Sequence, residues 1–221
     1  GNTVTNDSVI RSELLIDEGD PNSDVKVEQS ISRLKARNIF KKVEYKLQDG
    51  SSKDLKVMEI KVEEKPTGEI SAGAGVGTEW TSFQFAIKEN NYLGKGLGLD
   101  ASLNVTEHSI RGGLSMREPN FRNSGNLVWG GLTSLNTVRP DSGYENTLTQ
   151  FDLGTRFEHL TNLYVSPGIT LAFDELRVTE NASSSMKKQA GNFTELTFGY
   201  GIEKDNRDRV FMPTSGSLVS F

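Results

Sequence analysis

The stretch EISAGAGVGTEW, residues 69–80, decides how the larger part of this chain folds. Its apolar side chains fall at every second position, on Ile70, Ala72, Ala74 and Val76, with a serine and glycines at the positions between them. A period of two is typical of a β-strand with two unlike faces. A strand of a soluble sheet usually carries charged side chains opposite its apolar face, but here that face has almost no side chain. The stretch therefore predicts a strand that is apolar on one face, bare on the other and weakly packed.

The same alternation continues to the end of the chain, and we expect strands and turns there but no helix. Most of the segments approach the roughly 9–11 residues that a tilted strand needs to cross a bilayer. The predicted strands are 69–78, 81–90, 97–106, 109–118, 126–137, 147–158, 163–176 and 192–204, with another beginning at Ser217. Pro167 lies inside one of these strands, and because proline cannot donate to a ladder we expect a bulge or a break there.

Two unlike faces are predicted for the whole series of strands. The apolar side chains that share one face are Phe83, Phe85, Ile87, Leu97, Leu99, Ala101, Leu103, Val105, Ile110, Leu114, Met116, Leu127, Trp129, Phe151, Leu153, Phe157, Leu196, Phe198, Tyr200 and Ile202. The opposite face carries Gln84, Lys88, Asp100, Asn104, Arg111, Arg117, Asp152, Arg156, Glu195 and Glu203. This pattern fits a membrane barrel with a wet interior and a lipid-facing wall. We therefore predict an incomplete, all-antiparallel transmembrane barrel of about eight strands.

A soluble β-sandwich used as a binding module is the competing architecture. It requires the apolar faces to pack against each other instead of facing outward. Two sheets would then bury Phe85, Leu99, Leu103, Leu114, Trp129 and Phe198. No apolar run approaches the roughly 18 residues of a membrane helix, but barrel strands alternate and average out to polar.

The turns between the predicted strands also alternate in kind. One set is compact and consists of NNYLGKG, EPNFRNSG, EHLTN and DNRDRVFMPTSG. The other set includes long polar loops and consists of TEW, TEH, VRPDSGYEN and ELRVTENASSSMKKQAGN. Outer-membrane barrels have short periplasmic turns and longer outside loops, so we expect the two sets at opposite ends of the sheet.

Residues 1–66 follow a different period and predict a separate α+β domain ahead of the sheet, which takes residues 67–221. TNDSVIRSELLI begins with a capping residue followed by apolar residues at helical spacing, and DEGDPNS ends that helix. SDVKVEQSISRLKARN predicts a second helix with Val27, Ile31 and Leu34 on one face. IFKKVEYKL and LKVMEIKVEE alternate with a period of two around QDGSSKD, which predicts a hairpin.

The composition excludes several classes of function. The chain has no cysteine, which excludes a disulfide framework, a thiolate zinc site and a cysteine nucleophile. Its net charge of -5 leaves no basic footprint for nucleic acid. GAGVGT and GKGLG are each followed by more strand, whereas a phosphate loop needs a helix after it. We predict no catalytic residue, metal or cofactor, and the first residue, Gly1, indicates a piece of a longer chain.

Several of these segments resemble the BamA family of outer-membrane protein assembly factors. Residues 1–66 resemble the family's last POTRA repeat, entered after its first strand, with RNIFKKVEY at the start of the hairpin. NYLGKGLGL, EPNF and DRVFMPTSGS resemble its periplasmic turns. The residues that the last of these assigns to a structural turn are Asp208, Arg209, Pro213, Thr214 and Gly216. The family's later Val-Arg-Gly-Phe/Tyr motif is not reached before Phe221, so we expect only about half of the larger barrel.

The resemblance implies that the protein inserts and folds β-barrel proteins in the outer membrane. In this family the first barrel strand pairs poorly with the last, and a client strand can add to the exposed edge by main-chain hydrogen bonding. The residues that the resemblance assigns to this lateral gate are Glu69, Ile70, Ser71, Ala72, Gly73, Ala74, Gly75, Val76 and Gly77. The alternative for the glycines is that they only fit a curved barrel wall.

The partners implied are unfolded outer-membrane proteins, a BamD-like lipoprotein, other assembly-complex subunits and outer-membrane lipid, but no nucleic acid. The resemblance places the chain in the outer membrane with residues 1–66 in the periplasm. It assigns Glu18 as a contact for the lipoprotein, whereas by itself Glu18 is a solvent-facing residue beside the Gly19 that ends a helix. We also expect strand 40–48 to be an edge to which a partner's extended segment can add.

Other functions stay open at this point. Within the superfamily, the alternative is a TamA-like protein or a two-partner secretion transporter. From another class, the alternative is an outer-membrane barrel hydrolase, which lipase or protease activity lost on mutating a carboxylate would support.

Overall fold

The chain forms two compact units. The computed structural model describes residues 2–51, 56–77, 81–208 and 213–221. The first unit contains Gly1–Glu69 and Glu89–Leu99, and the second contains Ile70–Lys88 and Asp100–Phe221. The segment Glu89–Leu99, which is distant in sequence from the rest of the first unit, therefore belongs to that unit. The domain boundary after residue 66 stays a prediction.

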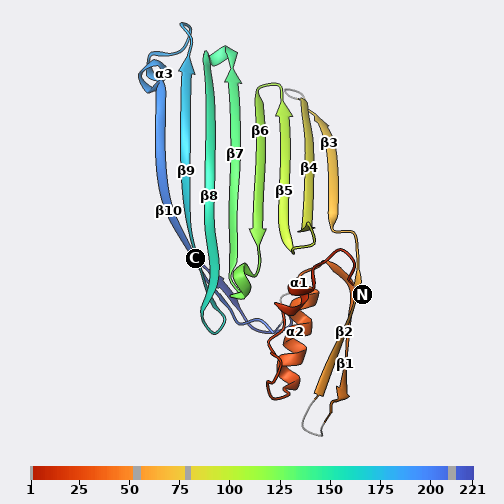
Figure 1. Ribbon diagram of the computed structural model, residues 1–221. Helices are drawn as coiled ribbons and strands as arrows, with labels where there is room; N and C mark the ends of the chain where they lie inside the picture. Colours follow the sequence, from red (N-terminus) through yellow and green to blue (C-terminus); the bar gives the residue numbers. More distant parts are fainter. Residues whose placement is uncertain (1, 52–55, 78–80, 209–212) are drawn as a thin grey trace. The chain divides into compact units, whose positions relative to one another are not determined.

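Two helices and a hairpin form most of the first unit, as the sequence predicts (Figure 1). The helices are α1, Asp7–Arg11, and α2, Asp24–Ala36, and the strands are β1, Phe40–Asp49, and β2, Lys56–Glu64. Ser23 caps α2, because its side chain accepts a hydrogen bond from the backbone N–H of Lys26. The N-cap of α1 is Asn6, which makes no side-chain capping hydrogen bond, and α1 is shorter than the apolar spacing indicates. It ends before Glu13, whose side chain is buried.

The core of the first unit lies between the helices and the hairpin. Val27, Ile31 and Leu34 are all at least 97% buried, which confirms the predicted apolar face of α2. The core cluster consists of Val9, Ile10, Ile31, Leu34, Ile39, Phe40, Val43 and Val62. Burial of such side chains is the main favourable term that holds a small α+β unit together.

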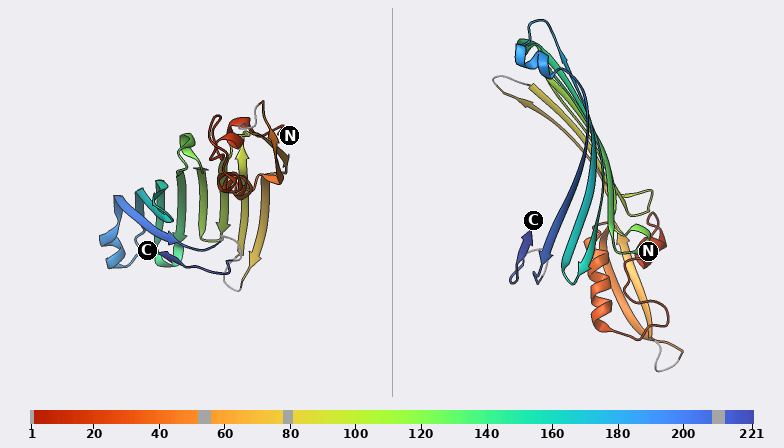
Figure 2. Two further views of the ribbon diagram at one scale, coloured as in Figure 1. Left: turned by 90° about the horizontal axis from the view of Figure 1, so that it is seen from below. Right: turned by 90° about the vertical axis from the view of Figure 1, so that its left-hand side faces the viewer.

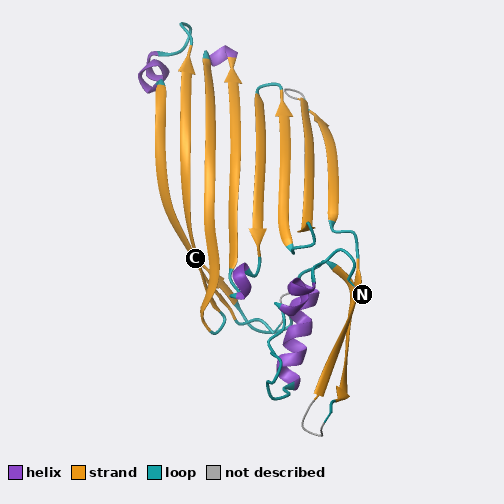
Figure 3. Cartoon of the chain, viewed as in Figure 1, coloured by secondary structure: helices purple, strands orange, loops and turns teal. Residues whose placement is uncertain are grey.

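One sheet of nine strands contains the rest of the strands among the described residues (Figures 1 and 3). The strands are β3 Gly68–Val76, β4 Thr81–Tyr92, β5 Leu97–Thr106, β6 Ser109–Glu118, β7 Leu127–Arg139, β8 Tyr144–Leu160, β9 Leu163–Val178, β10 Gly191–Asp205 and β11 Leu218–Ser220. Each strand lies beside the one that precedes it in the chain, so successive turns lie at opposite ends of the sheet. The sheet is one curved, unclosed layer (Figure 2), as expected for part of a barrel.

The strands in the second half of the sheet extend further than predicted. The pairing of Arg139 with Tyr144 continues the β7–β8 hairpin and leaves only the short 3-10 turn η2, Pro140–Ser142, and Gly143 between the strands. A second short 3-10 turn, η1, Phe121–Asn123, lies between β6 and β7. Each strand supplies the other's backbone partners, so the ladder does not need apolar residues to continue.

The expectation of no helix after residue 67 is wrong at one place. Helix α3, Ser184–Gln189, lies in the loop between β9 and β10. Ser183 caps it by accepting a hydrogen bond from the backbone N–H of Met186 at 3.3 Å. The polar run in this loop contains its own capping residue, a signal that a period of two does not reveal.

Pro167 causes no bulge in β9, and the expected break appears in only one of the two ladders of that strand. On one side Pro167 pairs with Tyr200 in an uninterrupted register. On the other side the pairing with β8 runs from Gly154–Gly168 to Phe157–Val165 in the same register, and the two positions between carry no ladder pair. The missing N–H thus interrupts one ladder locally, and the neighbouring strand keeps β9 extended.

Cross-strand pairs join the apolar positions into one continuous face. Leu114 lies opposite Leu132, and Leu132 lies opposite Phe151. Phe151 in turn pairs with Leu171, which pairs with Leu196. Directly opposed residues of neighbouring strands point to the same side of a sheet. The predicted apolar face is therefore confirmed from β6 to β10.

The register corrects the prediction for Leu127 and Trp129. Trp129 pairs with Arg117 on one side and with Gly154 on the other, and Leu127 pairs with Arg156. Both apolar side chains therefore lie on the polar face, not on the apolar one. Periodicity within β7 cannot decide which side chains lie on which face, because both faces of this strand carry large apolar and small residues. Only the pairing with β6 and β8 shows which face of β7 is the polar one.

The apolar face is open, which contradicts the sandwich architecture. Phe85 and Leu103 are each 44% exposed, Leu114 is 50% exposed and Phe198 is 74% exposed. No second sheet covers these side chains among the described residues. Monomeric soluble proteins rarely expose apolar patches of such extent. Among the described residues no helix has the length and apolar character needed to span a membrane.

Candidate functional site

The outer edge of β3, which pairs with no further strand among the described residues, is the candidate site for strand addition. β3 ends the strand order of the sheet, with β4 as its neighbour. The predicted gate residues 69–76 lie in β3, and Gly77 follows it. Ile70 is 71% exposed and Val76 is 86% exposed, and only Gly75 in this strand is half-buried. An edge strand presents a row of unpaired N–H and C=O groups, which is a template for another strand.

Crowding does not account for the glycine at position 73. A Cβ built on Gly73 would meet no atom within 4 Å. Glycine is needed where a backbone approaches closely or where φ is positive, and neither applies to Gly73. Its remaining effects are a weak strand and an uncovered backbone. Neither close packing nor a positive φ therefore explains the glycine at this position.

The turn between β4 and β5 docks on the N-terminal segment inside the first unit. Asn91, which is 6% exposed, donates through Nδ2 to Thr5 Oγ1 at 2.8 Å, and its Oδ1 accepts from the N–H of Gly96 at 2.7 Å. The N–H of Asn6 donates to the carbonyl of Gly94 at 2.8 Å. We name these five residues the turn clasp. Sequence reasoning identified the turn but missed the clasp, because no local pattern marks a partner 86 positions away.

Glu64 fixes the N-terminal half of the turn clasp. Its carboxylate accepts hydrogen bonds from the backbone N–H groups of Thr3 at 2.7 Å, Val4 at 3.1 Å and Thr5 at 2.6 Å. Burial raises the pKa of Glu64, but the hydrogen bonds from Thr5, Thr3 and Val4 outweigh it and hold the pKa well below its usual range. Glu64 therefore stays ionised at neutral pH and acts as a fixed acceptor.

A buried ion pair positions Arg37, which holds the Gly96 side of the turn clasp. Arg37 donates through Nη2 to the carbonyl of Gly96 at 3.2 Å. Its Nε lies 3.5 Å from Oε1 of Glu13, whose other carboxylate oxygen lies 3.1 Å from Nε of Arg33. The Glu13 side chain is only 6% exposed, so the carboxylate holds the guanidinium in place with little competition from water.

Asp208 organises the turn that precedes β11. Its carboxylate accepts from the N–H of Thr214 at 3.0 Å, from Thr214 Oγ1 at 2.8 Å and from the N–H of Ser215 at 3.1 Å. The hydroxyl of Thr214 and the N–H of Ser215 lower the pKa of Asp208. Gly216 has φ +98°, and a Cβ there would lie 2.2 Å from the carbonyl of Asn206. Pro213 is exposed, and the predicted Arg209 lies outside the described residues.

Glu18 projects into solvent on the first unit. Its side chain is 96% exposed, and Oε1 lies 3.4 Å from Nη1 of Arg11. An ion pair of this length and exposure contributes little stability. The carboxylate is therefore accessible to a partner, and its role as a lipoprotein contact stays a prediction.

A depression of about 590 Å³ lies beside the predicted edge strand β1. Its lining residues are Glu28, Ile31, Lys35, Val43, Glu44, Tyr45, Lys46, Glu59 and Lys61. Tyr45 donates to Glu28 Oε1 at 2.6 Å across it. Apolar side chains lie at its base and charges of both signs at its rim, an arrangement that suits an extended polypeptide.

The charged groups on the polar face of the sheet pair across strands. Arg117 Nη1 lies 2.7 Å from Asp100 Oδ2, and Arg156 Nη2 lies 2.6 Å from Glu203 Oε1. The guanidinium of Arg156 also lies over the ring of Tyr164, 4.4 Å from its centroid. Within the described ranges no three His, Cys, Asp or Glu side chains come together as metal ligands. These cross-strand pairs stabilise the polar face of the sheet.

Fold and site together define a POTRA-type unit followed by part of a membrane-barrel sheet. The family described as "Omp85 superfamily domain" matches residues 91–221. The POTRA family, described as "Surface antigen variable number repeat", matches residues 1–65. The chain belongs to the Omp85 superfamily.

Known relatives confirm the resemblance to the BamA family. The chain is 28% identical to the outer membrane protein assembly factor BamA of Neorickettsia risticii and covers 30% of it. It is 26% identical to the protein of the same name from Nitratidesulfovibrio vulgaris and covers 28% of that relative. These matches include 100% and 99% of this chain. The chain therefore spans less than a third of the length of these relatives.

A solved structure has the same fold. The crystal structure of BamA from Haemophilus ducreyi lacking POTRA domains 1-3 matches with a TM-score of 0.71 and 25% sequence identity. The match covers 100% of this chain and 45% of that one. The predicted fold class, a POTRA-like domain followed by an incomplete barrel, is confirmed.

Proposed function

We propose that the protein containing this chain inserts and folds β-barrel proteins in the outer membrane. Its relatives are named outer membrane protein assembly factors, and the open apolar face suits a wall in contact with outer-membrane lipid. Residues 1–66 lie in the periplasm in this proposal. The clients are unfolded outer-membrane proteins, and the work is done by strand pairing, without a catalytic residue or cofactor.

The observation that carries this proposal is the bare edge of β3. A client strand gains affinity there from main-chain hydrogen bonds, which do not depend on the client's sequence. The glycines keep β3 itself weakly packed, so the client competes with little side-chain packing. A protein that must accept many different strands gains from an edge with those two properties.

A reversible lock tests this mechanism. Ser71, which is exposed in β3, is replaced by cysteine in the full-length protein together with a cysteine on the last barrel strand. The protein is reconstituted in lipid vesicles, and the folding of an added urea-unfolded barrel client is followed by its heat-resistant band. We expect oxidation to lower the client folding rate by about tenfold or more, and reduction to restore it, because the locked edge offers no unpaired backbone.

The Ser71→Cys single variant under oxidant is the matched control and should fold clients at the normal rate. Normal client folding by the locked protein would exclude lateral opening at β3. Passage of clients through the vesicle membrane without insertion would favour a secretion transporter. Hydrolysis of lipid or protein by the purified protein would favour the hydrolase.

The proposed lipoprotein partner gives a second prediction. We expect Glu18→Lys to weaken capture of a BamD-like lipoprotein by the full-length protein roughly three- to tenfold, because a like charge then faces the partner's cation. Glu107→Lys makes the same change in net charge on the exposed β5–β6 turn and should leave capture unchanged. Capture would be measured by pull-down at two salt concentrations. Equal capture by Glu18→Lys and the parent protein would remove Glu18 from this interface.

A further inference from the structure

The turn clasp joins two parts of the first unit through buried polar groups. Thr5 and Asn91 are 3% and 6% exposed, and each satisfies the other. These groups lost their hydration on burial, so removing one of them leaves the other without a hydrogen bond and destabilises the docked turn. Turns on a protein surface seldom have such a buried side-chain pair, because they are usually solvated.

Two glycines make the close contact possible. Gly94 has φ +69°, and a Cβ there would lie 2.0 Å from the backbone carbonyl oxygen of Val4. Gly96 has φ +68°, and a Cβ there would lie 2.2 Å from Nη2 of Arg37. A backbone oxygen cannot move aside as a side chain can. Position 94 therefore excludes any side chain as long as the turn is docked.

Both halves of the clasp are anchored further inside the first unit. Glu64, at the end of β2, holds Thr5, and Arg37, after α2, holds Gly96. The turn is thus attached to the hairpin and to the second helix. β4 and β5 leave this turn and continue into the second unit, and β4 is the neighbour of β3.

We propose that the turn clasp is the attachment through which the POTRA unit acts on the barrel sheet. In this inference Thr5, Asn91 and Gly94 are positioning residues, and the β4–β5 turn moves with the POTRA unit and not with the rest of the sheet. Movement of the POTRA unit then reaches β4 and β5 directly, beside the strand-addition edge. The last step rests on the proposed function.

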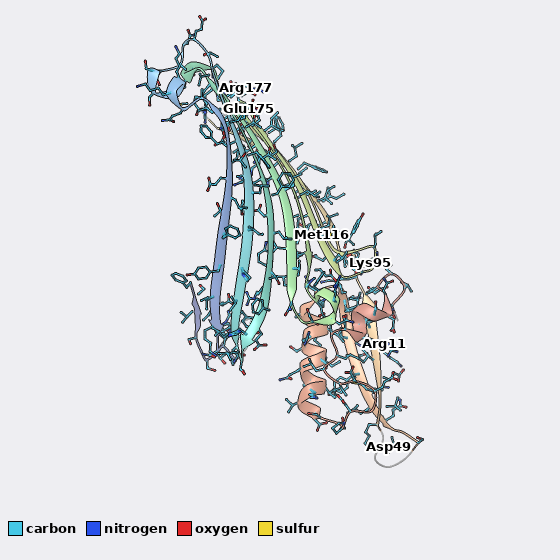
Figure 4. The ribbon with its side chains drawn as sticks, turned by 60° about the vertical axis from the view of Figure 1, so that its left-hand side comes forward. Arg11, Asp49, Lys95, Met116, Glu175 and Arg177 are labelled. Atoms are coloured by element: carbon cyan, nitrogen blue, oxygen red, sulfur yellow. The ribbon has the colours of Figure 1, made fainter. Side chains whose placement is uncertain are left out.

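Spin labels on both sides of the clasp test the attachment. Lys35 on α2 and Lys95 on the turn are both exposed, and both are replaced by cysteine in a full-length protein without other cysteines. Figure 4 labels Lys95. The distance distribution between the labels is measured in lipid vesicles. We expect a single narrow distribution in the parent protein, and in Gly94→Ala a distribution roughly twice as broad or more, because the turn undocks.

Gly125→Ala is the matched control. Gly125 lies in the β6–β7 turn with φ +76°, so alanine there carries similar backbone strain, but its Cβ would meet nothing within 4 Å. The label distance should not change in this variant. A second pair of variants, both at Thr5, tests the same contact if Gly94→Ala fails to fold. Thr5→Val, which removes the hydroxyl, should broaden the distribution, and Thr5→Ser, which keeps it, should not.

The functional arm uses the client-folding assay. We expect Gly94→Ala to slow client folding about fivefold or more, the low end of ordinary coupling between sites, and Gly125→Ala to leave the rate unchanged. A broad parent distribution, or an unchanged one in Gly94→Ala and Thr5→Val, would overturn the attachment itself. Undocking with a normal client-folding rate would overturn its role in function. A narrow parent distribution in a protein that folds no clients would defeat the proposed function and leave the attachment standing.

Discussion

Gly75→Pro is expected to abolish most client insertion, whereas Gly75→Val should leave most of it intact. Proline removes one N–H from β3 and fixes φ, so the strand loses a ladder donor. A buried acceptor left without its donor costs about 1–3 kcal/mol, which corresponds to roughly a five- to 150-fold loss in rate. Valine keeps the donor and has a higher strand propensity than glycine.

Comparing Gly75→Pro with Gly75→Val separates the effect of the backbone from the effect of the side chain at position 75. If β3 receives clients through its backbone, only the variant that changes the backbone should fail. Both proteins would be reconstituted in vesicles, and their own heat-resistant bands would establish that each barrel is folded before clients are added. Equal loss in both variants would mean that bulk at position 75 matters, and the glycine would then serve the shape of the wall.

Gly154→Val is expected to destabilise the sheet itself. Gly154 in β8 pairs with Trp129 in β7, and the indole lies so close that a Cβ would come within 2.2 Å of its ring. Valine would push the ring away and disturb the packing between the two strands. Overpacking of this kind costs roughly 1–3 kcal/mol. We expect a clear fall in the urea concentration at which the full-length protein loses its heat-resistant band.

Two variants make this prediction specific. Gly199→Val, on the same face in β10, introduces the same side chain where a Cβ would meet nothing within 4 Å, and it should cost little. Trp129→Ala removes the colliding ring, so Gly154→Val should cost much less in that background. This double-mutant cycle measures the contact directly. Additive effects of Trp129→Ala and Gly154→Val would contradict the contact.

The sequence alone predicts most of the fold because the signals are local. Alternation from residue 69 onward locates the strands, and the capped segments before residue 37 locate both helices. A side-chain period is a property of one segment and needs no partner to be recognised. The bare face of 69–77 is also visible in the sequence, since absent side chains need no structure to be counted. The edge position of that strand is not visible there.

Other features depend on the tertiary structure because they join distant residues. The phase of β7, and with it the polar-face position of Trp129, follows from pairing with β6 and β8 and not from the composition of β7. Pro167 is accommodated because Tyr200 holds its other side in register.

The turn clasp depends most completely on the fold. Asn91 and Thr5 belong to segments that a sequence pattern assigns to different domains. Their contact exists because two glycines let backbones approach and because burial excludes water from the hydrogen bonds. Local periodicity determined the strands, the helices and the bare edge of this protein. Only the packing of distant segments decided the facing of side chains and the docking of the turn, since both depend on which backbones come close together.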